Sequence, residues 1–251
     1  MHQENRLELA TKQVPWREAM KKTGIIIFAA AILIGVAFTS FLSLGNTTAK
    51  IFNFSIGSGT HGSGNVVLEK RDVGDFNGVD VGGVFQVEIV AQKDPGVEIE
   101  ADDNLLPLIK TEVNGGVLKI STNGNIKSKS AIRVRISALD IDSIEASGAS
   151  KVSVSDIKNS ELKIDTSGAS KVTLSGETGS LSVDISGASS LNANGLKAEN
   201  ATVDASGASY ADVNVSEQLI ADASGASKIN YSGSPKSAEK HSSGAGHVTN
   251  N

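Results

Sequence analysis

The sequence predicts an all-β fold, a parallel β-helix (solenoid) with about 19–20 residues per coil, preceded by one transmembrane helix. The β-helix is indicated by a short phrase, Ser-Gly-Ala, that begins at residues 147, 167, 186, 206, 224 and 243, at intervals of 20, 19, 20, 18 and 19. A period this short and regular is typical of a solenoid, in which each coil packs only against its neighbours. Apolar residues alternate at period 2 on both sides of the phrase, which indicates strands.

The transmembrane helix is predicted from Ile25–Leu44, twenty uncharged residues, about the length that spans a hydrocarbon core of ~30 Å. The residues before this run carry five basic and three acidic side chains, a net charge of +2, and the residues after it carry a net charge of −7. The positive-inside rule therefore places the N-terminus in the cytoplasm and the C-terminal domain in the periplasm or at the cell surface. A signal peptide cleaved near Asn46–Lys50 is the alternative, although its charged N-terminal region would be unusually long.

These patterns divide the chain into five segments. Residues 1–23 are a short cytoplasmic segment, residues 24–44 the transmembrane helix, and residues 45–65 a flexible tether rich in Gly and Ser. Residues 66–140 are expected to form irregular N-terminal turns of the β-helix, and residues 141–251 its regular coils and a C-terminal cap. Such caps protect the open strand edges at the ends of a solenoid.

The N-terminal turns contain a degenerate copy of the repeat, because "VDVGGVFQVEI" aligns glycine on glycine with "IEASGASKVSV". A short helical turn is expected around Asn104–Ile109, with the side chains of Asp102–Asn104 capping its start. The alternation in "AIRVRISAL" predicts a strand with Arg133 and Arg135 on its solvent-exposed face.

The glycine of each phrase is interpreted as a structural corner, because glycine allows a bend or a close backbone approach. These corner residues are Gly83 in the degenerate copy and Gly148, Gly168, Gly187, Gly207 and Gly225 in the repeats. If the alternation continues through the phrase, the glycine and the following serine both face the interior, and a ladder of hydroxyl groups bonds from coil to coil. The serines are Ser150, Ser170, Ser189, Ser209 and Ser227. If the chain bends at the glycine, they would lie at a solvated corner instead.

An acidic residue stands two positions before each repeated Ser, which predicts a column of carboxylates about 4.8 Å apart. Its members are Glu145, Asp165, Asp184, Asp204 and Asp222, with Asp80 in the degenerate copy. Lysines just past the phrase are expected to compensate this charge across the corner: Lys151, Lys171 and Lys228. The column has three open interpretations, a solvated face, a surface that binds a glycan, and a cation site, for which one carboxylate per coil supplies few ligands. Tyr210, which the alternation points outward, is the other candidate contact residue.

The amino-acid composition argues against several classes of function. The chain has no Cys, which excludes disulfides and thiol chemistry, and its net charge of −5 argues against a nucleic-acid partner. No catalytic residue, metal site or cofactor is predicted. The acids are spread one per coil, whereas a β-helix that cleaves polysaccharides needs several carboxylates gathered with a Lys or Arg in one groove.

The stretch "EIEADDNLLPLIKTEVNGGVLKIST" followed by a row of "SGAS" coils resembles a bacterial family common in Bacteroidetes, domain of unknown function 2807. This family is also called the "putative auto-transporter adhesin, head GIN domain". The resemblance covers roughly Val73 to Tyr231. It implies a parallel β-helix on the cell envelope and supplies no catalytic motif.

The sequence therefore predicts a membrane-anchored, envelope-exposed β-helix that acts as an adhesin-like binding or structural module without catalysis. Its expected partners are the lipid bilayer, through residues 25–44, and an envelope glycan or protein. Two alternatives remain open, a carbohydrate-active enzyme of the β-helix type and the ectodomain of an envelope sensor. The ligand and the oligomeric state are not predicted.

Overall fold

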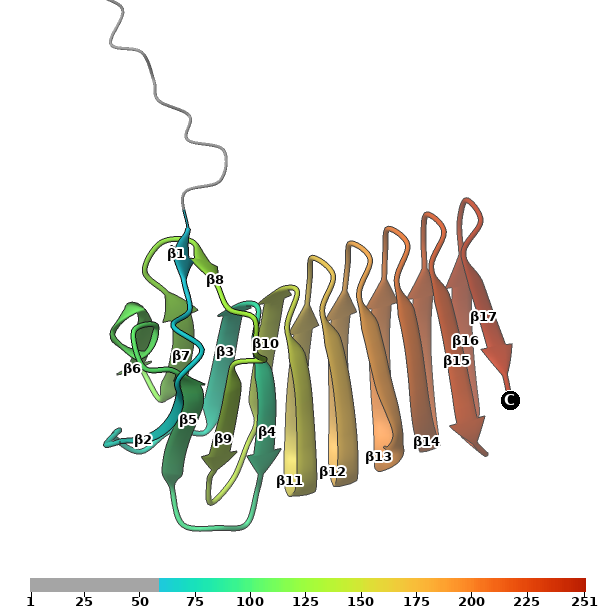
Figure 1. Ribbon diagram of the computed structural model, residues 1–251. Helices are drawn as coiled ribbons and strands as arrows, with labels where there is room; N and C mark the ends of the chain where they lie inside the picture. The colour runs from blue at the N-terminus through green and yellow to red at the C-terminus, as the bar shows by residue number, and fades with distance from the viewer. Residues whose placement is uncertain (1–58) are drawn as a thin grey trace, which may run out of the picture. The chain divides into compact units, whose positions relative to one another are not determined.

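The computed structural model describes residues 59–251, which form an all-β solenoid of about five turns (Figure 1). The β-solenoid predicted from the sequence is confirmed. The predicted cytoplasmic segment, transmembrane helix and most of the tether lie outside the described residues. Among residues 59–251, no helix is long and apolar enough to cross a membrane.

Each regular coil consists of one long, bent strand, and these strands are interrupted only at the repeated phrase. They are β11 (Lys151–Thr166), β12 (Lys171–Ile185), β13 (Ser190–Ala205) and β14 (Tyr210–Ala223). All pair in parallel with their neighbours, and Figure 1 shows them stacked in chain order. The last coil is divided into β15 (Lys228–Gly233), β16 (Ser237–Ser242) and β17 (His247–Asn250).

The bent strands pass from one side of the solenoid to the other, so we distinguish two sheets. The first sheet has the order β6 (Ile109–Asn114), β7 (Val117–Thr122), β3 (Gly78–Gly83), β10 (Ser143–Gly148), the C-terminal halves of β11 to β14, and β16. The second sheet has the order β2 (Val66–Arg71), β5 (Gly96–Asp102), β9 (Arg133–Ser137), β4 (Gln86–Val90), the N-terminal halves of β11 to β14, β15 and β17.

The core between the two sheets is built from the apolar half of the period-2 pattern. Ile144, Ile164, Val183, Val203 and Ala221 pair in register from coil to coil, and all five are almost completely buried. Burial of a valine or isoleucine side chain contributes about 1.5–3 kcal/mol. Each coil thus stabilises the fold by stacking like residues on like residues.

Differences in coil length are absorbed at the corner opposite the repeated phrase. Between β11 and β12 the register shifts after Val154, and between β12 and β13 it shifts after Thr173. The pairs on the first sheet, which lead into the phrase, remain in uninterrupted register. The 18- to 20-residue intervals therefore leave the geometry of the phrase unchanged.

The N-terminal end differs from the regular coils in strand direction. Strand β5 is antiparallel to both β2 and β9, and β6 is antiparallel to β7. These antiparallel strands lie at the N-terminal edges of the two sheets, beyond β3 and β4 (Figure 1). They cover edges that the parallel coils would otherwise leave open.

The last residues of the predicted tether belong to the folded domain. Strand β1 (Thr60–His61) pairs in parallel with β8 (Ile126–Lys127). The Ser63 hydroxyl and the Asn65 amide donate to the Asp103 carboxylate, and these bonds lower the pKa of Asp103. The Gly- and Ser-rich composition indicated a flexible segment. The residues that bind this segment lie about forty positions away in the chain, so the local sequence does not reveal them.

The expected helical turn is present as a short 3₁₀ helix, η2 (Leu106–Leu108), but the predicted side-chain caps are absent from its start. Asp102 instead accepts hydrogen bonds from the Gly64 amide and the Ser128 hydroxyl, at 3.0 and 2.6 Å. The polar side chains before η2 therefore hold the N-terminal segment rather than cap the helix. The amides and hydroxyls that donate to them occupy the oxygens that a helix cap would need.

The C-terminal coil carries a charge at an inward-facing position. In β16, Lys240 stands in register with the buried Ala221 of the preceding coil. Its ammonium lies 5.5 Å from the centroid of the Tyr231 ring, within range of a cation–π interaction. An inward-pointing lysine is one of the devices that protect an open strand edge.

Candidate binding surfaces on the two sheets

The glycines of the repeated phrase lie in one column at a corner of the solenoid. A Cβ added to Gly168 would lie 2.5 Å from the carbonyl oxygen of Gly148, and the same contact recurs at each neighbouring pair. The backbone there has φ between +70° and +77°, a conformation that favours glycine, and φ is +139° at Gly83. The column contains Gly83, Gly148, Gly168, Gly187, Gly207 and Gly225. These residues shape the corner and offer no side chain to a ligand.

The serines that follow these glycines are buried, whereas the glycines themselves are at the surface of the bend. Their hydroxyls do not form the predicted ladder from hydroxyl to hydroxyl. The Ser150 hydroxyl donates to the carbonyl of Gly83 at 3.1 Å, and that of Ser227 donates to the carbonyl of Ala205 at 3.0 Å. The bend brings these carbonyls close, and a carbonyl oxygen with two lone pairs can accept from both an amide and a hydroxyl. The buried serines are Ser150, Ser170, Ser189, Ser209 and Ser227.

The acidic residues form a column along the outer face of the first sheet. They pair in register from coil to coil, in the order Asp80, Glu145, Asp165, Asp184, Asp204 and Asp222. At the N-terminal end of the column, the Asp80 carboxylate accepts a hydrogen bond of 2.6 Å from the Lys119 ammonium. This bond raises the pKa of Lys119. Within the column, partial burial and the charges of Asp222 and Asp184 raise the pKa of Asp204.

The acid column has no counter-charge from the lysines that were expected to compensate it. Lys151, Lys171 and Lys228 begin the strands on the far side of the corner and lie on the second sheet. Within residues 59–251 none of the three forms an ion pair with a column member. No group of three or more His, Asp or Glu side chains in the described part of the chain gathers to hold a metal ion.

Tyr210 is also on the second sheet, at the start of β14, and is half-buried. Its hydroxyl accepts a hydrogen bond from the Asn230 amide at 2.8 Å. Tyr210 and the acid column therefore lie on different sheets, so they do not form one surface.

A groove that the sequence did not predict lies on the second sheet, where the N-terminal turns meet the first regular coils. It has a volume of about 470 Å³ and crosses the adjacent strands β9, β4, β11 and β12. One row of side chains across it pairs in register as Arg133, Gln86, Lys151 and Lys171. The neighbouring row includes Arg135 and Glu88. Four cationic side chains thus converge on one surface.

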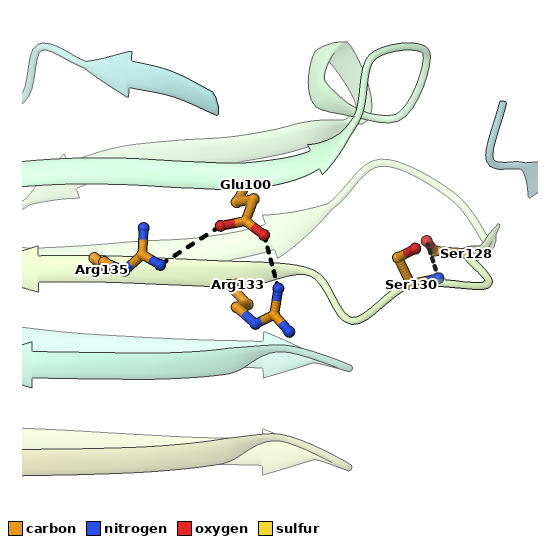
Figure 2. Close-up of polar contacts among 5 residues, drawn as sticks. All are labelled: Glu100, Ser128, Ser130, Arg133 and Arg135. Atoms are coloured by element: carbon orange, nitrogen blue, oxygen red, sulfur yellow. Dashed lines mark hydrogen bonds and ion pairs between the residues drawn. The ribbon is translucent and has the colours of Figure 1, made fainter. Parts of the chain in front are cut away.

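The two arginines of the groove are held by a single carboxylate from β5. Glu100 contacts Arg133 at 2.7 Å and Arg135 at 3.5 Å, as Figure 2 shows. Each guanidinium has five N–H donors, so one shared carboxylate leaves most of them available. Both arginine side chains remain about half exposed. The arrangement orients two cations toward solvent without neutralising them both.

Sequence patterns contained only part of the signal for this groove. The alternation in β9 indicated that Arg133 and Arg135 face solvent, and a lysine follows the phrase in two successive coils. The order β9, β4, β11 could not be deduced, because β4 and β9 are separated by β5 to β8 in the chain. The lysines were assigned to the acid column because contacts across the corner were expected, whereas the corner directs them to the second sheet.

The comparisons with known proteins agree with this architecture. Residues 75–235 match the model of the family domain of unknown function 2807, described as "putative auto-transporter adhesin, head GIN domain". No curated protein matches the chain.

Several solved structures share the fold. A "putative adhesin" from Bacteroides fragilis is 20% identical, and the match covers 77% of this chain and 100% of that chain with a TM-score of 0.65. A "putative adhesin" from Parabacteroides distasonis is 22% identical with the same coverage and a TM-score of 0.54. A "putative lipid binding protein" from the same organism is 17% identical, again with 77% and 100% coverage, and has a TM-score of 0.50. At these identities the likeness establishes the fold alone. The family match covers more than half of the chain, and the chain therefore belongs to the family domain of unknown function 2807, "putative auto-transporter adhesin, head GIN domain".

Proposed function

We propose that this protein is an adhesin-like binding module of the bacterial cell envelope that carries out no catalysis. The observation that carries the proposal is the cationic groove on the second sheet, formed by β9, β4, β11 and β12. The repeat alone does not require this surface, because two of its cations come from β9, which precedes the regular coils. Structures with the same fold that bear the name adhesin support this choice.

The proposal includes an uncleaved membrane anchor at Ile25–Leu44, with the N-terminus in the cytoplasm and the solenoid outside. Its support is the twenty-residue uncharged run and the charge difference across it. The test is protease treatment of intact cells and spheroplasts that express the full chain with tags at both ends. An anchored protein sediments with membranes and keeps its N-terminal tag protected, whereas a cleaved protein loses that tag and leaves the membrane fraction.

A carbohydrate-active enzyme is the second candidate, because Glu88 lies in the groove beside Arg135, its neighbour in register on β9. A carboxylate next to a cation can serve acid–base chemistry on a sugar. The second acid of the region, Glu100, is engaged by both arginines, which favours binding over proton transfer.

The two candidates are separated by one screen of the full-length chain against an array of bacterial and host glycans. A binding module retains a defined subset of glycans and releases them unchanged, as mass spectrometry of the eluted glycans would show. An enzyme shortens them or creates new reducing ends. If no glycan on the array is retained or cleaved, the proposed function is wrong.

A further inference from the structure

The groove on the second sheet continues into a second pocket. This pocket has a volume of about 360 Å³ and shares Gln86 and Lys151 with the groove. It adds the hydroxyl-bearing residues Ser128 and Ser130, and the Ser130 amide donates to the Ser128 hydroxyl at 3.2 Å (Figure 2). The two hollows together make an extended surface that suits a linear ligand better than a small compact one.

Lys151 and Lys171 are directly opposite each other on neighbouring strands of this surface. Like charges at such positions destabilise a sheet. Within the described residues neither ammonium group has a hydrogen bond or an ion pair, and the next coil has Ser190 at this position. The fold therefore does not require the pair, and an anionic group placed between the two ammonium groups would remove their repulsion.

The surface also contains hydrogen-bond acceptors and hydroxyl groups, and these determine which class of anionic ligand it suits. Ser153 and Thr173 stand beside the two lysines in the neighbouring row, and Glu88 lies in the same row. In the groove itself, and with Glu100 included, four cations face two carboxylates, a local net charge of +2 on a chain of net charge −5. A nucleic acid presents a phosphate at every residue and is repelled by these carboxylates and by the overall charge. A sugar chain with some acidic groups can use the cations for its charges and the carboxylates and hydroxyls for its own hydroxyl groups.

We propose that this surface binds an acidic oligosaccharide, with its carboxylate or sulfate groups at Lys151 and Lys171 and its hydroxyl groups along Glu88, Ser153 and Thr173. The inference rests on the proposed function and specifies the ligand class. The surface has no exposed aromatic ring in its lining, since Phe85 is only 2% exposed. Recognition therefore depends on charge and hydrogen bonds rather than on stacking.

The test is calorimetric titration of the full-length chain at low ionic strength with hexagalacturonate, its neutral methyl ester, a single-stranded DNA of similar charge, and vesicles of anionic lipid. Hexagalacturonate is expected to bind, and the methyl ester to bind at least about tenfold more weakly. The double variant Lys151→Gln/Lys171→Gln is expected to lose at least about tenfold in affinity, because hydrogen bonds to charged groups contribute strongly. Added salt should weaken the wild-type interaction.

The matched control is Lys110→Gln/Lys163→Gln, which removes the same charge from exposed positions on the first sheet. It should bind like the wild type, and both double variants should melt at the wild-type temperature. Equal losses in the two variants, equal binding of the methyl ester, or tighter binding of DNA or vesicles that Lys151→Gln/Lys171→Gln weakens would each overturn the inference. If the glycan array shows neutral glycans whose retention is unaffected by Lys151→Gln/Lys171→Gln, the inference fails while the proposed function stands.

Discussion

Gly187 stacks on Gly168 so closely that a Cβ on Gly187 would lie 2.6 Å from the Gly168 carbonyl oxygen. The φ of Gly187 is +72°, where any other residue is strained. Both effects act on backbone atoms, which cannot move aside without shifting a whole coil. The contact explains why the solenoid uses glycine at this point in every turn.

Replacing Gly187 by Val is therefore expected to lower the free energy of unfolding by at least about 2–3 kcal/mol, from the φ penalty and the steric overlap together. Ser186→Val changes a neighbouring, partly exposed side chain and should cost about 0.5 kcal/mol or less. Gly244→Ala is a graded control, because its Cβ would be 3.0 Å from Gly225 O. Urea denaturation compares the three. Equal stabilities of the Gly187 and Ser186 variants would refute the corner role.

The buried Thr166 hydroxyl has no hydrogen-bond partner, and Thr166 occupies a position that Ala146 and Ile185 fill in adjacent coils. Thr166→Val keeps the shape and removes the unsatisfied group, so the free energy of unfolding should rise by about 1 kcal/mol. Thr178→Val is the control, because the Thr178 hydroxyl donates to the Ser180 carbonyl at 3.2 Å. That variant should be less stable by about 1 kcal/mol. Thermal denaturation that gave both changes the same sign would contradict this account.

Stability should also depend on the charge of Asp204. Its pKa is raised above the usual 3.8 by partial burial and by Asp222 and Asp184, so the folded state binds the proton more tightly than the unfolded state. The resulting destabilisation is complete above the folded pKa and disappears as the pH falls below the unfolded value. Asp204→Asn should therefore raise the melting temperature at pH 7.5 and give little gain near pH 3.5. Salt should reduce the gain at pH 7.5. A gain that grew on acidification would show that the sign is wrong.

The N-terminal segment should loosen when Asp102 is replaced by Ala. Asp102 is 1% exposed and its carboxylate accepts from the Gly64 amide and the Ser128 hydroxyl, so Asp102→Ala breaks two hydrogen bonds to a charged group, at a cost of about 1–3 kcal/mol. Hydrogen exchange should accelerate at the Thr60 amide, which donates to Asn125, while amides of β12 and β13 stay protected. The control Asp165→Ala removes the same charge from the acid column. Unchanged exchange at Thr60 in the Asp102 variant would show that β1 is held without this carboxylate.

The period of the repeat predicted the parts of the fold that repeat and little else. Residues such as Ile164 and Asp165 follow from alternation, because their neighbours in space are the equivalent residues of adjacent coils. The corner between Asp165 and Lys171 sends these two residues to opposite sheets, and only the bend at Gly168 reveals this. The groove depends on β9 lying beside β4, and the placement of β1 depends on β8. Both are pairings between segments that share no repeat.

The central claim, that the second sheet is the binding surface, is tested most directly by lysine footprinting of the full-length chain with an amine-reactive ester. Lys151 and Lys163 are both exposed on β11 but face outward from different sheets, so Lys163 is an internal control on the same strand. Hexagalacturonate, or the best ligand from the array, is expected to protect Lys151 and Lys171 and to leave Lys163 unchanged. Protection of Lys163 equal to that of Lys151, or no protection of either, would contradict the account.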